Sequence, residues 1–152
     1  MILGLDINTK IIGYSILDND QLIDFGIINI SKLSDIFDKL SFVKDILFSL
    51  KDKYSITKIA TEDFLAKFAA GRSRISTIIV LAQINSLINY ECFNVFNIKP
   101  ELINVLKARK LILGKSWSKE YVNSKEFVFQ NIIKIFDIKD KLDLLKNNKY
   151  DV

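Results

Sequence analysis

Asp6 is the first residue whose type and position could serve chemistry. It lies in the apolar segment 2–7, ILGLDI, which has the composition of a strand. A carboxylate within such a segment is costly unless it is paired with a cation or bound to a metal ion. The structural alternative is an Asp at the end of a strand that caps the following turn at 8–10.

Glu62 supplies a second carboxylate in a similar setting. It ends the apolar segment Ile56–Glu62, and strand alternation turns the neighbouring Asp63 toward the opposite face. Two acids brought together from adjacent strands repel each other unless a cation lies between them, and an oxygen-rich pocket suits Mg²⁺ or Mn²⁺. Two such ions can bind the attacking and leaving oxygens of a phosphodiester, so these acids favour metal-dependent hydrolysis.

The composition excludes the other common routes to hydrolysis. The chain has no His, which removes Ser-His and Cys-His triads and histidine metal ligands together. The single Cys92 excludes a disulfide framework and any multi-cysteine zinc site, and its aromatic neighbours predict a buried thiol in a reducing compartment. Carboxylate, lysine, hydroxyl and backbone groups remain.

Charge is distributed unevenly along the chain. Residues 1–63 carry a net charge of −3, and residues 64–119 carry +7, with nine Lys or Arg against two acids. Such a basic segment is consistent with binding to the phosphate backbone of nucleic acid, because that affinity comes largely from displaced counterions. A merely solvated basic surface would have the same composition.

The size of the chain predicts a single domain. Its 152 residues, 49% of them hydrophobic, are enough for one compact domain with a full core. No apolar stretch approaches the roughly 20 residues that span a bilayer, and the N-terminus lacks a signal-peptide pattern. These features predict a soluble protein of the cytoplasm.

Hydrophobic periodicity predicts the elements that must position the two acids. The predicted strands are Met1–Ile7, Ile12–Leu17, Leu22–Ile30, Ile56–Glu62 and Phe93–Ile98. The predicted helices begin at Ser34, cover Ser76–Tyr90, run from Pro100 to about Leu113 before Gly114, and cover 118–136 with Val122, Phe129, Ile133 and Phe136 inward. The helix Ser76–Tyr90 is apolar almost all round, as expected of a helix that packs on both a core and a dimer partner.

The order of these elements predicts a mixed α/β fold. An antiparallel meander comes first, and strands that alternate with crossover helices follow. Ribonuclease H-like proteins have this chain order, although periodicity alone leaves it one candidate among several α/β arrangements.

The two acidic strands resemble those of RuvC-type Holliday junction resolvases. Residues 2–17, ILGLDINTKIIGYSIL, have an acid at the end of the first strand, a Ser/Thr turn, and then Gly-Tyr in the second strand. Residues 59–64, IATEDF, resemble the family's second acidic strand, and 67–73, KFAAGRS, resemble the loop that enters the junction. Ser76–Tyr90 resembles the helix through which these proteins dimerise. The resemblance covers nearly the whole chain and is nearest to the bacteriophage-encoded branch.

This resemblance implies a single RuvC-like nuclease domain over residues 1–152. The implied fold is ribonuclease H-like, of the retroviral-integrase superfamily, with a mixed five-stranded sheet flanked by helices. Asp6 and Glu62 match the first two metal-binding acids of the family, and Asp151 matches the third. The implied cofactor is two Mg²⁺ ions per active site, for which Mn²⁺ can substitute.

The end of the given sequence departs from the family pattern. The family's closing motif has two acids three residues apart on a final helix, whereas this sequence ends at Val152, without the fourth acid and most of that helix. Asp140 and Asp143 are also three apart. We interpret them as a solvated helix face, because leucines replace the small residues expected beside them.

The resemblance also assigns DNA-binding residues. Lys125 matches a lysine that faces the scissile phosphate, although a single Lys on a helix is usually solvated. Phe68, or Phe64, is the aromatic that would wedge between bases at the crossover, and the alternative for Phe64 is that it continues the strand into the core. Further DNA contacts are predicted at Lys67, Arg72, Arg74, Lys107, Arg109, Lys110 and Lys119.

The implied function is a homodimeric crossover junction endodeoxyribonuclease. It would cut Holliday junctions and other branched DNA, such as forks, in the cytoplasm of a bacterial host cell. The alternative is a catalytically inactive branched-DNA-binding module of the same fold. An actin-like or sugar-kinase ATPase also opens with a strand ending in Asp, but it needs a Gly close to Asp6, where residues 7–9 supply none.

Overall fold

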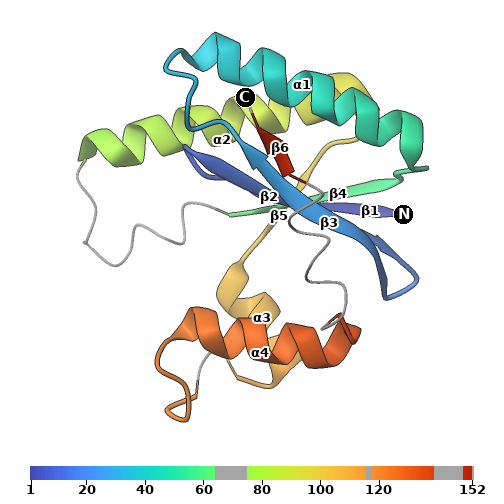
Figure 1. Cartoon of the computed structure of the whole chain (residues 1–152), viewed down its shortest axis with the longest axis vertical. Helices are drawn as coiled ribbons and strands as arrows, with labels where there is room; N and C mark the ends of the chain where they lie inside the picture. The colour runs from blue at the N-terminus through green and yellow to red at the C-terminus, as the bar shows by residue number, and fades with distance from the viewer. Residues whose placement is uncertain (64–74, 116–117, 139–148, 152) are drawn as a thin grey trace.

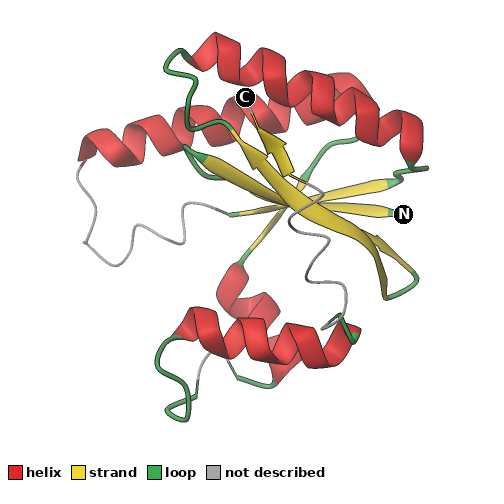
Figure 2. Ribbon diagram, viewed as in Figure 1, coloured by secondary structure: helices red, strands yellow, loops and turns green. Residues whose placement is uncertain are grey.

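The computed structural model describes residues 1–63, 75–115, 118–138 and 149–151. They form a six-stranded sheet with two helices on each side (Figure 1; Figure 2). The strands are β1 (Ile2–Asp6), β2 (Ile11–Asp18), β3 (Gln21–Asn29), β4 (Lys58–Glu62), β5 (Glu101–Ile103) and β6 (Lys149–Asp151). The helices are α1 (Ile36–Lys53), α2 (Ile75–Phe96), α3 (Val105–Leu113) and α4 (Ser124–Phe136).

The strand order in the sheet is β5-β4-β1-β2-β3-β6. β1, β2 and β3 form the predicted antiparallel meander, and β4 and β5 continue the sheet in parallel with β1. β1 therefore lies between β2 and β4 in the interior of the sheet. Its C-terminal end is flanked by backbone on both sides, which fixes the position of whatever side chain stands there.

Two predicted elements are wrong. The segment Phe93–Ile98 was predicted as the fifth strand, but α2 continues through Phe96, because Cys92, Val95 and Phe96 keep the helical spacing of its buried face. The fifth strand is β5, which follows Pro100 where a helix was predicted to begin. β6 is a sixth strand that the sequence did not predict, and it pairs in parallel with β3.

Helices α1 and α2 cover one face of the sheet (Figure 1). α1 begins after Asp35, whose carboxylate accepts hydrogen bonds from the backbone N–H groups of Phe37 and Asp38. Such a cap satisfies donors that have no partner within the helix. The core lies between these helices and alternate residues of β1, β2, β3 and β4. None of the described helices is long and apolar enough to cross a membrane.

Helices α3 and α4 lie on the other side of the sheet (Figure 1). α3 is capped by Asn104 and ends at Gly114, whose φ of 72° is the left-handed conformation that glycine adopts without strain. α4 begins at Ser124, later than the predicted 118, because Asn123 caps it. Phe127 is its buried residue, whereas Val122 and Phe129, both predicted to face inward, are 88% and 50% exposed.

Candidate active site

Asp6 and Glu62 end two adjacent strands. β1 and β4 run in parallel, and their last paired residues are Leu5 and Thr61. Both of these residues are buried on the face that α1 and α2 cover. Because side chains alternate along a strand, the acids that follow them project together from the opposite face. The predicted meeting of the two carboxylates is therefore supported by the register of the sheet.

Glycine keeps the flank of Asp6 open. Gly13 of β2 is the residue paired with Asp6, and a Cβ at position 13 would lie 3.9 Å from the Asp6 Cβ. Any larger side chain there would stand beside the carboxylate on the same face. The neighbouring surface is equally bare, since an open depression of about 370 Å³ is lined by the small residues Gly4, Ser15 and Ala60 as well as by both acids. A ligand can therefore approach the acids across the sheet.

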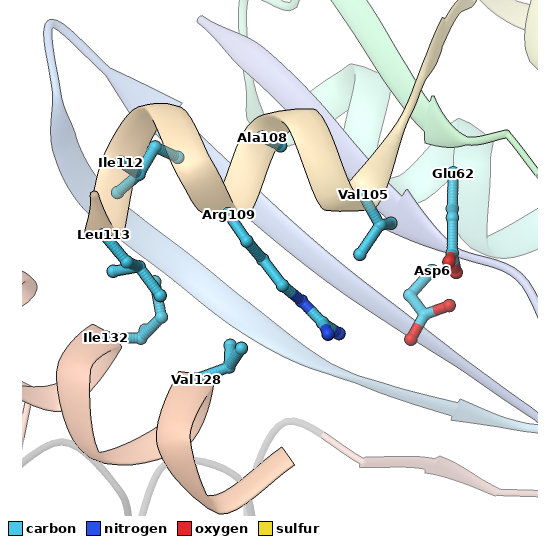
Figure 3. Close-up of a pocket in the computed structure, with 9 residues that line it drawn as sticks. All are labelled: Asp6, Glu62, Val105, Ala108, Arg109, Ile112, Leu113, Val128 and Ile132. Atoms are coloured by element: carbon cyan, nitrogen blue, oxygen red, sulfur yellow. The ribbon is translucent and has the colours of Figure 1, made fainter. Parts of the chain in front are cut away.

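The two acids also line a pocket of about 280 Å³ between the sheet and helices α3 and α4. Arg109 extends from α3 into this pocket, toward Asp6 and Glu62 (Figure 3). The remaining lining residues are apolar: Val105, Ala108, Ile112, Leu113, Val128 and Ile132. The pocket thus combines two carboxylates and one guanidinium within otherwise apolar walls.

Two solved structures share this arrangement of elements. A structure of RuvC from Thermus thermophilus has a TM-score of 0.64 at 8% identity, over 91% of this chain and 80% of that chain. T. thermophilus RuvC in complex with a Holliday junction substrate has a TM-score of 0.68 at 7% identity, over 91% of this chain and 79% of that chain. This chain has the RuvC fold. No protein-family model matches the sequence, and no curated protein matches it significantly.

The RuvC fold confirms the ribonuclease H-like class predicted from the order of elements. The predicted mixed sheet, an antiparallel meander followed by parallel strands, is present, with β6 added at the β3 edge. Because the sequence identity to these structures is below 10%, the similarity shows the fold alone, and the chemistry depends on the residues of this chain.

The donor set at Asp6 and Glu62 fits a hard divalent cation. Both groups are carboxylates, and they come from strands about 4.8 Å apart. Within the described part of the chain, no cluster of three or more His, Cys, Asp or Glu side chains is present. The structure therefore brings two of the three predicted acids together.

Asp151 is placed differently from the expectation. It was predicted to begin the family's closing helix, but it belongs to strand β6, where its backbone pairs with Asn29 of β3. β2 and β3 lie between β6 and β1, so about three strand spacings, roughly 14 Å, separate its backbone from that of β1. Asp140 and Asp143 lie outside the described residues.

The predicted DNA-binding residues fall into three groups. Arg109 lines the acid pocket, whereas Lys107, Lys110 and Lys119 are exposed. Lys125 is exposed on α4 and lines a separate depression with Val122 and Phe129. The remaining predicted residues lie outside the described part of the chain; they are Phe64, Lys67, Phe68, Arg72 and Arg74.

Cys92 has no place in this chemistry. It is fully buried in α2, and burial, with a smaller contribution from Glu91, raises the pKa of its thiol to about 12. A thiol held in its neutral form is a poor nucleophile. This agrees with the prediction that Cys92 is a buried thiol.

Sequence reasoning missed two groups around the acids. One is the apolar wall of the pocket, which depends on how α3 and α4 pack and has no signal in the sequence. The other is a set of hydrogen bonds beneath β4, from Thr61 to Asn89 and from Asn89 to Asn85. Its signal was present, since two Asn residues four apart interrupt an apolar helix on one face.

Proposed function

We propose that this protein is a divalent-metal-dependent endonuclease that cuts Holliday junctions and other branched DNA. The observation that carries the proposal is the position of Asp6 and Glu62 at the ends of the adjacent strands β1 and β4, in one pocket, with Arg109 extending toward them from α3. The RuvC fold supports the choice of substrate, because one of the similar structures is RuvC in complex with a Holliday junction substrate.

Each of the three charged residues of the pocket has a role in this proposal. Asp6 and Glu62 would hold Mg²⁺ or Mn²⁺, which supplies an activated water and stabilises charge on the phosphate when bound. The planar guanidinium of Arg109 can donate two hydrogen bonds to phosphate oxygens. Arg109 would therefore hold the scissile phosphate against the acids.

Asp151 and Lys125 complete the proposed site from greater distances. For Asp151 to reach Asp6 as a third ligand, β6 would have to leave the edge of the sheet. Lys125 lies one helical turn before Val128, which lines the pocket. In this proposal Lys125 would stabilise charge on the scissile phosphate from α4.

We also propose a homodimer formed through α2. Its outer face exposes Ile75, Ile79, Val80, Tyr90 and Phe93. An apolar stripe of this kind is typical of a surface that binds another protein. A two-fold axis through α2 would give paired sites for paired incisions. We further propose that the chain is a single nuclease domain encoded by a bacteriophage. It would act in the cytoplasm of the bacterial host.

Substitution of the two acids tests the proposed function. Asp6→Asn and Glu62→Gln should each lower Mg²⁺-dependent cutting of a four-way junction by more than about 100-fold, because each removes a charged metal ligand. Junction affinity in a gel-shift assay should change little. Asp63→Asn is the matched control, an adjacent acid outside β4. Cutting within about tenfold of wild type for both variants would contradict the two-acid site.

The second candidate is a branched-DNA-binding module without nuclease activity. It is favoured by the presence of two clustered acids, not three, in the described residues. The same assay separates the candidates. Junction binding by the wild-type protein with no cutting in either Mg²⁺ or Mn²⁺ would favour the binding module.

A further inference from the structure

A chain of hydrogen bonds joins α2 to β4 directly beneath the proposed site. The Thr61 hydroxyl donates to Asn89 Oδ1 at 2.9 Å. Asn89 Nδ2 donates to the backbone oxygen of Asn85 at 2.8 Å and to its Oδ1 at 2.9 Å. Thr61 and Asn85 are each only 1% exposed, and Asn89, which joins them, is half-buried.

These polar groups stand in an apolar layer. On the same helix, Ile84, Ile88 and Cys92 pack against the sheet. A polar group in such a layer is costly without a hydrogen-bond partner, whereas a satisfied network fixes one arrangement of the elements it joins. An aliphatic residue at position 89 would fill the same space without joining α2 to one particular residue of β4.

That residue is the one before Glu62. Pairing between β1 and β4 ends at Leu5 and Thr61, and beyond this point β4 continues to pair with β5, where Glu62 lies beside Ile103 and the Asp63 N–H donates to the Ile103 carbonyl. The Thr61 hydroxyl points to the helix side, and Glu62 points to the site. The bond to Asn89 therefore fixes the strand at the last position before the carboxylate.

We propose that Thr61 and Asn89 are positioning residues that hold Glu62 beside Asp6 and so set the affinity of this acid pair for a divalent cation. The inference rests on the proposed function, because it assigns the acid pair to a cation. It differs from a purely structural role in one respect. Loss of the bond weakens cation binding even in protein that is fully folded.

Mn²⁺ binding by the whole chain tests the inference without any measurement of cutting. Free Mn²⁺ is followed by electron paramagnetic resonance, at a temperature where circular dichroism shows each variant to be folded. Thr61→Val removes the hydroxyl and keeps the shape, and it should weaken Mn²⁺ binding by about tenfold, as losses of supporting groups around metal ligands do. Thr61→Ser keeps the hydroxyl and should restore affinity to within about twofold.

Two further variants make the result decisive. Thr57→Val is the matched control, because Thr57 donates to the Met1 carbonyl at 3.2 Å just before β4, far from the acids, and it should leave Mn²⁺ affinity unchanged. Thr61→Val combined with Asn85→Leu and Asn89→Leu removes all three side chains of the network, so that none of them is left without its partner. This combined variant should fold even if Thr61→Val does not, and its Mn²⁺ affinity should still fall.

The outcomes separate the inference from the proposed function. Wild-type Mn²⁺ affinity in the folded combined variant would overturn the inference, and Asp6-dependent binding by the wild-type chain would leave the proposed function standing. If Asp6→Asn binds Mn²⁺ as tightly as wild type, the acid pair holds no cation, and both proposals are overturned. Weak binding by Thr61→Val and by the combined variant, together with near wild-type binding by Thr61→Ser and Thr57→Val, would establish the positioning role.

Discussion

Arg109 sets the electrostatics of the acid pocket. Its positive charge faces two carboxylates within apolar walls, where charges interact more strongly than in water. In the proposed mechanism the guanidinium offsets part of the repulsion between Asp6 and Glu62, and it would bind a phosphate once a metal cation neutralises the two acids. Lys107 and Lys110 flank Arg109 in the sequence but are exposed.

Replacement of Arg109 should therefore lower the rate of cutting, whereas replacement of Lys107 should change the salt dependence of binding. Arg109→Ala should lower the single-turnover rate of junction cutting by about 100-fold, the scale seen when a group that stabilises transition-state charge is removed. Lys107→Ala should leave that rate nearly unchanged and reduce the salt dependence of junction binding by about 0.9 per lost phosphate contact. Cutting rates and affinities at several salt concentrations check both. Equal losses of rate in the two variants would place the phosphate elsewhere.

The acids of the site were predictable from sequence, whereas their surroundings were not. Asp6 and Glu62 each interrupt an apolar strand, and a carboxylate within such a segment is informative without any knowledge of the fold. Which of the three cations on α3 faces them depends on the rotation of that helix against the sheet, and 105–113 is too short and too mixed in character to fix that rotation. Long-range packing therefore determines which basic side chain of α3 enters the acid pocket.

At the level of elements, local patterns favoured the wrong structure twice. The segment 93–98, FNVFNI, has the alternation and aromatic content of a strand, but burial of Cys92, Val95 and Phe96 against the core keeps it helical. β5 and β6 have three residues each, too few to produce a periodic signal. β6 also pairs with a strand more than a hundred residues earlier, a contact that no local window contains.

β6 should nevertheless contribute to stability. Tyr150 packs its ring against Tyr14 of β2, with the ring centroids 6.0 Å apart, and it joins the edge of the core. Tyr150→Ala should lower the free energy of unfolding by about 1–3 kcal/mol, measured by urea denaturation, because it removes an aromatic pair and its buried area. Phe37→Ala is the control, since Phe37 is 75% exposed and should cost little. Equal stabilities for the two variants would mean that β6 does not pack on the sheet in solution.

At the scale of the whole molecule, the two faces of the sheet do different work. α1 and α2 close one face into a core, and the other face carries the acids and the bare surface beside them. α2 belongs to both tasks, because its inner side contacts Thr61 through Asn89 while its outer side is exposed. In the proposed dimer, α2 of each chain would therefore lie between the dimer interface and the acid pair of that chain.

A charge placed on the outer side of α2 tests this arrangement. Ile79 is 51% exposed, and Ile79→Asp should separate the proposed dimer, because an aspartate buried in an apolar interface has no partner. Light scattering at micromolar concentration should find a dimer for the wild-type chain and a monomer for the variant. Ile135→Asp is the matched control, since Ile135 on α4 is 50% exposed and should leave the dimer intact.

The cutting pattern should change in parallel. Wild type would release products cut on two strands, whereas the monomer would leave single nicks, because one chain brings one acid pair to the junction. A wild-type monomer that still makes paired cuts would contradict the assignment of α2 as the dimer interface.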